Sequence, residues 1–215
     1  MISYKHKCIF VHIPKTGGTS LENIIWPRAK DRTESNLWMG FISGFHNKYQ
    51  TGGLQHLLST QIRQEVGDQV FNSFFKFTVV RNPWDKAISQ FLYMKKRKSL
   101  RDFMGMSEDD CFKQYLSLIQ KKNHVQWEPQ YKFVFDDQGC LLVDFIGKFE
   151  NFEQDAYKIL DQSGVKTKIL GIRVKKIPHT NKSNRLHYTE YYDTESREIV
   201  QNLYQKDIEI FNYTF

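Results

Sequence analysis

A turn near the start of the chain carries side chains that could bind an anion. Residues 12–20, HIPKTGGTS, follow the apolar run CIFV. The turn offers one ammonium group, three hydroxyls and two glycines, which are Lys15, Thr16, Gly17, Gly18, Thr19 and Ser20. Glycine lets the backbone approach a ligand with its N–H groups turned inward, and a following helix points its positive end at the same place. The turn predicts a cradle for a tetrahedral oxyanion; a turn that merely needs glycine is the alternative.

The order of residues in this turn bears on the kind of group that is transferred. A nucleoside-triphosphate P-loop reads GxxxxGK[ST], whereas Lys15 here precedes the glycines. No acidic residue ends an apolar strand where it would hold magnesium. A phosphoryl group carries two charges and depends on a metal, while a sulfuryl group carries one, which a lysine and backbone dipoles can balance. The turn favours sulfuryl transfer without a metal; a nucleotide kinase or another phosphotransferase is the alternative.

A second cationic group ends another apolar run. Arg81 follows FKFTVV and precedes NPWD, where a helix is expected to start. A guanidinium in this position can bind a phosphate with two hydrogen bonds. Ser89 lies two turns into that helix and could reach the same anion. The spacing also allows an alternative, in which Arg81 forms a surface ion pair with Asp85.

The elements that carry these groups predict the fold class. The runs at residues 8–13 and 74–80 are continuous and apolar, as in strands buried on both faces of a parallel sheet. A helix is expected after each run, the first capped by Thr19 or Ser20 and the second by Asn82. Alternating strands and helices predict an α/β fold, a P-loop-like three-layer domain whose mainly parallel central sheet is flanked by helices.

Later segments carry the same kinds of signal. They predict short helices from Ser59 or Thr60 and a hairpin that turns at residues 137–139. A further helix is expected to be capped by Asn151 and Gln154 and to end at Gly164, and a last helix to cover about residues 194–206. No repeat or linker divides the chain. Residues 1–215 are therefore expected to form a single domain.

The composition favours a folded protein with an anionic partner. Hydrophobic residues make up 40% of the 215 residues and aromatic residues 15%, which excludes a disordered chain. The formal net charge of +7 favours a nucleotide, a sulfated or carboxylated sugar, a nucleic acid or a membrane surface. An excess of surface lysine that only maintains solubility is the alternative.

Cysteine usage and the lengths of the apolar runs indicate the compartment. Cys8, Cys111 and Cys140 are far apart and odd in number, which fits neither a disulfide framework nor a zinc site. Cys8 and Cys140 lie in apolar runs and are expected to be buried free thiols. The chain contains no run of 18 apolar residues and no secretory signal. We expect a cytoplasmic protein without a transmembrane segment.

Two motifs and the tail resemble one enzyme family. HIPKTGGTS resembles the 5′-phosphosulfate loop, and FKFTVVRNPWDKAISQF the 3′-phosphate motif, of sulfotransferases that use PAPS (3′-phosphoadenylyl sulfate). The segments GKFENFEQDAYKIL and IPHTNKSNRLHYTEYYDTESREIVQNLYQKDIEIFNYTF resemble the same family. The similarity covers most of the chain and is greatest to the group related to Golgi carbohydrate sulfotransferases and its bacterial members.

The resemblance implies a role for each matching residue. The 5′-phosphosulfate would be held by Lys15, Thr16, Gly17, Gly18, Thr19 and Ser20. Arg81 and Ser89 would hold the 3′-phosphate, and the segment Asn181, Lys182 and Ser183 would close over the cosubstrate. PAPS would be the donor and the bisphosphate PAP the product, without a metal. Lys15 would also donate to the bridging oxygen as PAP leaves.

A proton acceptor is needed for the acceptor hydroxyl, and histidine has a suitable pKa. Members of the family usually have a histidine where His56 stands, before the arginine motif, and His56 is therefore the predicted base. His46 is the second choice, and a carboxylate is a third. His12 ends a strand beside the turn and is as readily packed beneath it.

The acceptor is expected to be a hydroxyl of a sugar or glycan. An aromatic face and hydrogen-bonding groups suited to a sugar ring occur together at Gln126, Trp127, Glu128 and Gln130. Trp38 and the basic residues 95–98 are further candidates, although core packing and a solvated face explain them equally well. No nucleic-acid partner is expected. A non-catalytic anion-binding or nucleic-acid-binding domain is the alternative from another functional class.

Overall fold

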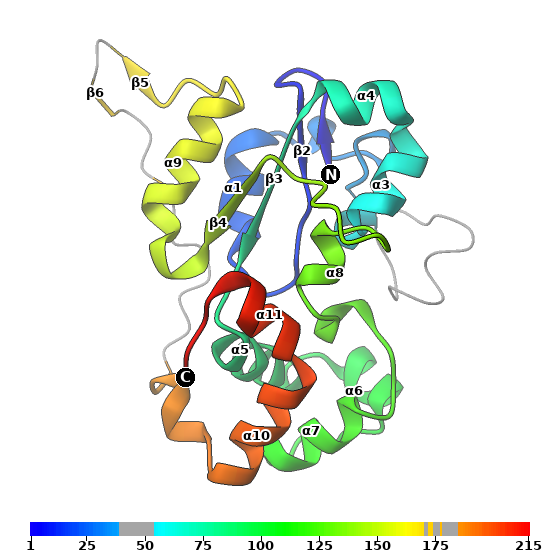
Figure 1. Cartoon of the computed structure of the whole chain (residues 1–215), viewed down its shortest axis with the longest axis vertical. Helices are drawn as coiled ribbons and strands as arrows, with labels where there is room; N and C mark the ends of the chain where they lie inside the picture. Colours follow the sequence, from blue (N-terminus) through cyan, green and yellow to red (C-terminus); the bar gives the residue numbers. More distant parts are fainter. Residues whose placement is uncertain (39–53, 170–171, 174–176, 178–184) are drawn as a thin grey trace.

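The computed structural model describes residues 1–38, 54–169, 172–173, 177 and 185–215. A four-stranded sheet occupies the upper half of the molecule in Figure 1, in the order β1-β2-β3-β4. Its strands are β1 (Ile2–Ser3), β2 (Cys8–Phe10), β3 (Phe75–Val80) and β4 (Phe145–Lys148). The strands β2, β3 and β4 are parallel, and β1 is antiparallel to β2. The predicted α/β fold with a mainly parallel sheet is confirmed. A separate short pair joins β5 (Lys168–Ile169) and β6 (Ile172–Arg173).

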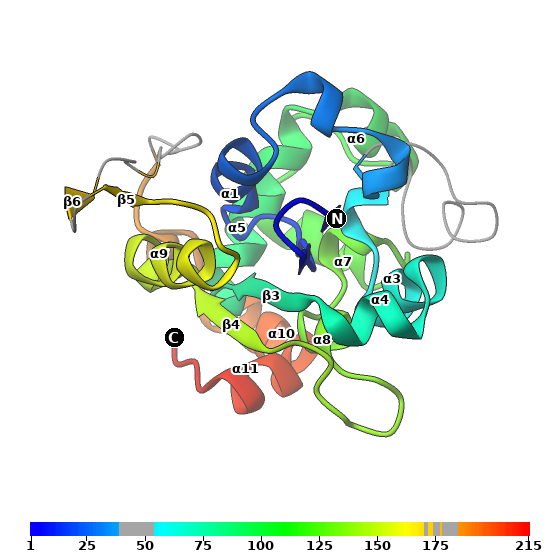
Figure 2. The ribbon, with the colours of Figure 1, turned by 90° about the horizontal axis from the view of Figure 1, so that it is seen from above.

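Side chains of β2 and the residue after it alternate between two hydrophobic clusters. Cys8 and Phe10 pack with α1 and α9, while Ile9 and Val11 pack with α3, α4 and α8. The bounds of these helices are α1 (Gly18–Ile25), α3 (Ser59–Val66), α4 (Asp68–Ser73), α8 (Tyr131–Val134) and α9 (Phe152–Gln162). Figure 2 shows α9 and α3–α4 on opposite sides of the strands. Burial on both faces explains why the run is apolar at every position.

A row of phenylalanines crosses the sheet beneath α1 and α9. Phe10 is in register with Phe77, and Phe77 with Phe145. The rings of Phe10 and Phe77 stack with their centroids 4.9 Å apart. This register brings the carboxyl ends of β2 and β3 to the same edge of the sheet, so the two anion-type turns that follow them are neighbours.

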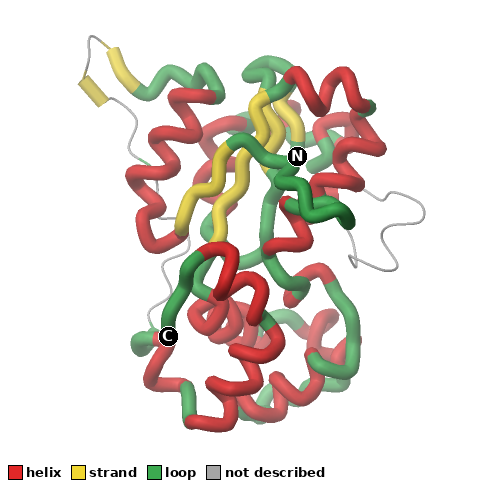
Figure 3. Tube along the Cα trace, in the orientation of Figure 1, coloured by secondary structure: helices red, strands yellow, loops and turns green. Residues whose placement is uncertain are grey.

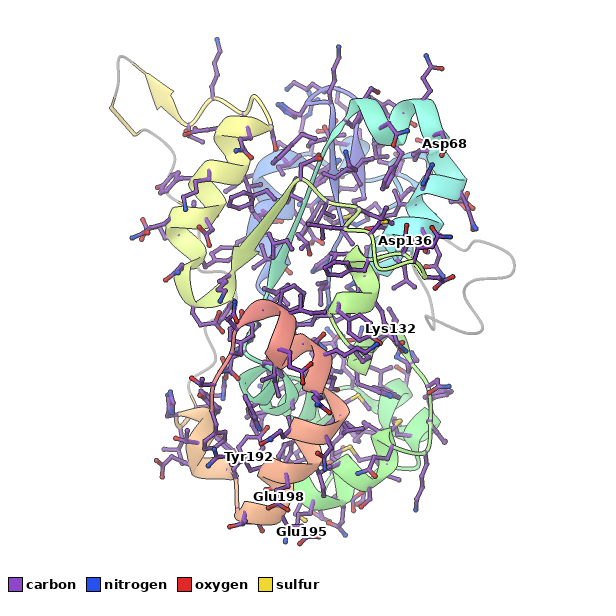
Figure 4. The ribbon with its side chains drawn as sticks, viewed as in Figure 1. Asp68, Lys132, Asp136, Tyr192, Glu195 and Glu198 are labelled. Carbon is purple, nitrogen blue, oxygen red and sulfur yellow. The ribbon has the colours of Figure 1, made fainter. Side chains whose placement is uncertain are left out.

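The other half of the molecule is helical (Figure 3). Its helices are α5 (Pro83–Lys95), α6 (Lys98–Met104), α7 (Phe112–Ile119), α10 (Thr194–Leu203) and α11 (Gln205–Phe211). A third hydrophobic cluster joins α5, α6, α7 and α10. Tyr192, labelled in Figure 4, donates its hydroxyl proton to the carbonyl of Trp84 over 2.8 Å. The segment before α10 is thereby held against α5.

Several predicted boundaries are confirmed. The side chain of Asn82 accepts the N–H of Trp84 at 3.0 Å and caps α5, with Pro83 in the first turn. The helices α3 and α4 are the two short helices expected from Ser59. The helix α9 ends just before Gly164, which has a left-handed φ of 65°.

The hairpin predicted around residues 137–139 is wrong for its first arm. Residues 131–134 form α8, because the Asp207 carboxylate accepts the N–H groups of Gln130 and Tyr131 at 2.8 Å and caps the helix from a distant part of the sequence. One isolated bridge, from Phe135 to Leu141, is what remains of the hairpin. Asp136, labelled in Figure 4, accepts the N–H groups that close this turn.

Two predicted caps and one predicted thiol are also wrong. Helix α1 begins at Gly18 after Gly17, whose φ of 84° suits glycine, so neither Thr19 nor Ser20 is the cap. The side chain of Asn151 makes no capping hydrogen bond in α9, so the pair with Gln154 does not form. Cys140 is exposed because it lies on the turn after α8, whereas Cys8 is buried as expected.

The last predicted helix is divided in two. It breaks at Tyr204, where ψ is 25°, and continues as α11. The Tyr204 hydroxyl donates to the carbonyl of Trp127 at 2.9 Å. After the break, Phe211 packs in the cluster beneath the sheet instead of the helical cluster. Within the described residues, none of the helices is sufficiently long and apolar to span a membrane.

Candidate active site

A cleft of about 1540 Å³ opens at the carboxyl ends of β2 and β3. Residues of both predicted anion motifs line it, namely Lys15, Gly17, Gly18, Thr19, Ser20, Arg81 and Ser89, and so does the predicted base His56. Segments that are far apart in the sequence thus share one cleft, as the parallel strands require. The predicted site residues His46, Asn181, Lys182 and Ser183 lie outside the described residues.

The turn before α1 combines unusual backbone geometry with close packing. Lys15 has a φ of 68°, which a residue with a side chain adopts only when its surroundings hold it there. A Cβ on Gly18 would lie 2.4 Å from the His12 ring, so this position needs glycine for packing as well. Thr16 is buried and its hydroxyl donates to the carbonyl of Ile13 at 2.9 Å. Of the hydroxyls in the turn, those of Thr19 and Ser20 are at the cleft.

The ammonium group of Lys15 is short of counter-charge. Its Nζ lies 4.1 Å from the centroid of the Tyr93 ring, a cation–π contact. Burial, followed by repulsion from Arg81 and Arg97, lowers the pKa of Lys15 to about 8. No salt bridge joins Lys15 to a carboxylate within the described part of the chain. An anion in the cleft would supply the missing negative charge.

Arg81 joins the two anion motifs. One of its guanidinium nitrogens, Nη1, donates to the carbonyl of Lys15 at 2.8 Å, and Nε donates to Asp85 Oδ2 at 2.8 Å. The guanidinium carbon lies 4.0 Å from the centroid of the Phe149 ring. The ion pair with Asp85 therefore exists, but it is buried in the cleft and is no surface pair. Burial lowers the pKa of Arg81, although Asp85 opposes this shift.

Charges in the cleft are unequal. Among the described residues, five cationic side chains line it, which are Lys15, Arg81, Lys96, Arg97 and Arg185. Two carboxylates, Asp85 and Glu150, line the same cleft, so the balance is three positive charges. Asp85 also pairs with Arg185, and it thus lies between two guanidinium groups. A concave site with this excess attracts a ligand of several negative charges.

Two histidines line the cleft, and a buried glutamate pairs with one of them. His56 Nδ1 lies 3.0 Å from the carbonyl oxygen of His12, and the two rings lie 4.6 Å apart. A ring nitrogen that faces a carbonyl oxygen carries the proton, so the lone pair of neutral His56 is on Nε2. Burial and repulsion from His12 hold the pKa of His56 well below its usual value. A neutral imidazole beside the anion-binding turn can accept a proton.

Glu22 is a member of this site that the sequence did not indicate. Its Oε1 lies 2.8 Å from His12 Nδ1. Burial raises the pKa of the Glu22 carboxyl, but the charge and hydrogen bond of His12, together with the N-terminal ammonium and Arg32, leave that pKa below its usual value. The place of this glutamate among Leu21, Ile24 and Ile25 on the apolar side of the helix was the available signal, since a glutamate that is buried there is rarely unpaired. His12 is packed beneath the turn, on the ring of Phe10.

The candidates for acceptor binding are dispersed. Gln126 lines the cleft, whereas Gln130 is fully buried and Trp127 packs in the helical cluster. Glu128 pairs with Lys132 and Trp38 packs near Trp26. Of the basic residues 95–98, Lys96 and Arg97 line the cleft, while Lys98 pairs with Asp102 at the surface.

Taken together, the fold and the cleft define an α/β protein with a strongly cationic, nucleotide-sized site at the ends of its parallel strands. Residues 1–214 match the sequence model of the "Sulfotransferase family". The chain belongs to this family, and the resemblance found in the motifs is thereby confirmed.

Three relatives illustrate the range of similarity. Carbohydrate sulfotransferase 10 of Xenopus laevis is 22% identical over 258 residues, covering 99% of this chain and 66% of that protein. Its counterpart in Danio rerio is 23% identical over 243 residues, covering 97% of this chain and 64% of that protein. An uncharacterized protein of Archaeoglobus fulgidus is 30% identical over 112 residues, covering 48% of this chain and 79% of that protein. The chain spans about two thirds of the length of the two carbohydrate sulfotransferases. No solved structure matches this chain significantly.

Proposed function

We propose that this protein transfers the sulfuryl group of PAPS to a hydroxyl of a carbohydrate acceptor, in one P-loop-like three-layer domain formed by residues 1–215. The observation that carries this proposal is the hydrogen bond of 2.8 Å between Arg81 Nη1 and the carbonyl of Lys15. This hydrogen bond connects the turn of Lys15, which suits the 5′-phosphosulfate, to Arg81, which suits the 3′-phosphate. PAP and PAPS carry an anionic group at each end of one nucleoside, which fits two cationic elements in a single cleft.

The donor set of the cleft fits PAPS. Lys15 and the N–H groups at the start of α1 would hold the 5′-phosphosulfate, with the hydroxyls of Thr19 and Ser20. Arg81 and Ser89 would hold the 3′-phosphate. Three of the five guanidinium N–H groups of Arg81 are engaged by Asp85 and Lys15, which leaves two for a ligand. Closure of Asn181, Lys182 and Ser183 over the nucleotide stays a prediction.

His56 is the proposed base. PAPS would supply the sulfuryl group at the cleft. Nε2 of His56 would take the proton of the acceptor hydroxyl, because Nδ1 is engaged by the carbonyl of His12. The ammonium of Lys15 would stabilise the negative charge that develops on the departing phosphate oxygen. No metal is part of the proposal, and His46 stays the alternative base.

The proposed acceptor is a sugar or glycan hydroxyl. The names of two relatives support a carbohydrate. Gln126 offers hydrogen bonds at the cleft, and Lys96 and Arg97 add positive charge there, which favours an acidic sugar. A cytoplasmic location stays a prediction.

Thermal denaturation with PAP, ADP and ATP tests the nucleotide assignment. A ligand at a hundred times its Kd stabilises the native state by about 2.7 kcal/mol. We expect PAP to raise the Tm most, with the same shift in EDTA as in magnesium. Arg81→Ala should remove most of the PAP shift. A larger shift with ATP that requires magnesium would instead support the kinase alternative.

Transfer itself is tested by incubating the protein with labelled PAPS and a panel of neutral and acidic glycans. We expect label to move to an acidic glycan and PAP to form in equal amount. A protein that binds PAP but labels no acceptor of any class, and that binds oligonucleotides with steep salt dependence, would support the non-catalytic alternative.

A further inference from the structure

Gln130 is bonded to the backbone of Arg81 in both directions. Its Oε1 accepts the Arg81 N–H at 2.9 Å, and its Nε2 donates to the Arg81 carbonyl at 2.8 Å. Arg81 lies between the end of β3 and the cap of α5, where neither element supplies a partner for these groups. A buried peptide group without a partner is costly, so the amide of fully buried Gln130 stabilises this position of Arg81.

Gln130 is itself held by α11. The carboxylate of Asp207, which is fully buried, accepts the N–H of Gln130 at Oδ2 and that of Tyr131 at Oδ1, both at 2.8 Å. Both oxygens are engaged, so a small movement of residues 130–131 would break a charge-assisted hydrogen bond. Two sets of hydrogen bonds therefore connect α11 to the backbone of Arg81.

The position of this backbone decides where the guanidinium lies. Asp85 and the carbonyl of Lys15, each at 2.8 Å, hold the far end of the side chain together with the Phe149 ring, whose centroid lies 4.0 Å from the guanidinium carbon. A change of the Arg81 peptide planes would tilt the side chain out of these contacts and turn its two remaining N–H groups away from the cleft. Two parallel hydrogen bonds to an oxyanion depend on that direction.

We propose that Gln130, held by Asp207, is a positioning residue that fixes Arg81 for a phosphate and so sets the preference of the cleft for a nucleotide with a 3′-phosphate. The proposal rests on the proposed function of the cleft. It assigns Gln130 a role at the donor nucleotide, and no contact with the acceptor.

The test compares PAP with 5′-AMP, which differ by the 3′-phosphate alone. Calorimetric titration measures the Kd of 5′-AMP divided by the Kd of PAP, a ratio that rises with the preference for the 3′-phosphate. It is measured for the wild type and for Gln130→Met, which keeps side-chain volume and removes the amide. Gln130→Met should lower this ratio roughly tenfold, about the value of one charge-assisted hydrogen bond, and should change the Kd of 5′-AMP by less than about twofold. Asp207→Asn should lower the ratio in the same direction by a smaller factor.

Gln90→Met is the matched control. Gln90 is also a buried glutamine, it lies on α5, and its amide makes no hydrogen bond to any described residue. We expect the wild-type ratio for this variant. Far-UV circular dichroism establishes that each variant is folded.

The outcomes are distinct. A folded Gln130→Met protein with the wild-type ratio, or with equal losses for PAP and 5′-AMP, would overturn the proposal, because the second result is that of a purely structural role. If Gln130→Met does not fold, an unchanged ratio in Asp207→Asn overturns it. A wild-type protein that binds 5′-AMP as tightly as PAP would contradict the proposed function itself.

Discussion

Lys15 illustrates how the surroundings of a single residue determine its chemistry. Its φ of 68° turns the backbone carbonyl toward Arg81, while its ammonium lies on the ring of Tyr93. A lysine in this turn was evident from the sequence. The left-handed backbone and the neighbouring cations were not, because residues 81, 93 and 97 reach Lys15 only after the sheet and α5 have assembled.

The lowered pKa of Lys15 predicts the alkaline limb of the pH profile. In the proposed mechanism Lys15 stabilises the leaving oxygen in its protonated form, and its pKa falls from 10.5 to about 8. We therefore expect kcat/KM, which reports the free enzyme, to decline as the pH rises through about 8. In Lys15→Arg the group stays charged, so this limb should disappear even if the rate is lower. An unchanged limb in Lys15→Arg would exclude Lys15 as its source.

His56 makes a separate prediction. In His56→Gln, PAP should bind within about twofold of the wild type, because the side chain removed is not one that holds the nucleotide, while the transfer rate should fall by about 10² to 10⁴. Titration with PAP and single-turnover transfer from labelled PAPS measure the two effects. His6→Gln, a histidine outside the cleft, is the control and should transfer normally. Normal transfer in His56→Gln would require another base.

At the scale of elements, local sequence signals predicted several helices and strands whose bounds depend on local interactions. The strands β2 and β3, the cap of α5 and the end of α9 follow from apolar runs, Asn82 and Gly164. Two local predictions, the caps of α1 and α9, were wrong, and long-range contacts decided α8 and the division of the last helix. The carboxylate of Asp207 makes residues 131–134 helical, and the break at Tyr204 divides the last helix. Neither partner is near in sequence, so periodicity could not have shown them.

The junction of β2 and α1 yields a prediction about Gly18. A Cβ at this position would lie 2.4 Å from the ring of His12, which is confined between Phe10 and Glu22. We expect Gly18→Ala to lower the free energy of unfolding by about 1–3 kcal/mol through overpacking. Urea denaturation measures the change.

A double-mutant cycle identifies the cause. In a His12→Ala background the ring is absent, so Gly18→Ala should cost less than in the wild type, with an interaction energy of about 0.5–3 kcal/mol. Equal costs in the two backgrounds would show that the His12 ring is not what Gly18 accommodates.

At the scale of the whole molecule, Figure 1 shows a half built on the sheet and a half built of helices. The cleft is lined by residues of both halves, such as Lys15 of the turn after β2 and Ser89 of α5. Several segments of the described chain connect these halves, and two of them bear on how the halves are coupled. One is the direct passage from β3 through Arg81 into α5. The other is α11 with the residues that follow it, because Phe211 and Tyr213 pack beneath the sheet while Ile208 and Phe215 pack against the helical cluster. The sequence predicted one domain from length and the lack of a linker, but this second connection required the structure.

These connections predict that the two halves unfold together. Phe211 is buried, and Phe211→Ala should lower the free energy of unfolding by about 3–5 kcal/mol. Trp26 reports the sheet half, and Trp84 with Trp127 reports the helical half. One variant retains Trp26 and another retains Trp84 and Trp127. Their urea unfolding transitions should coincide, and Phe211→Ala should shift both equally. Two separate transitions, with the substitution moving one of them, would mean that the halves are independent units.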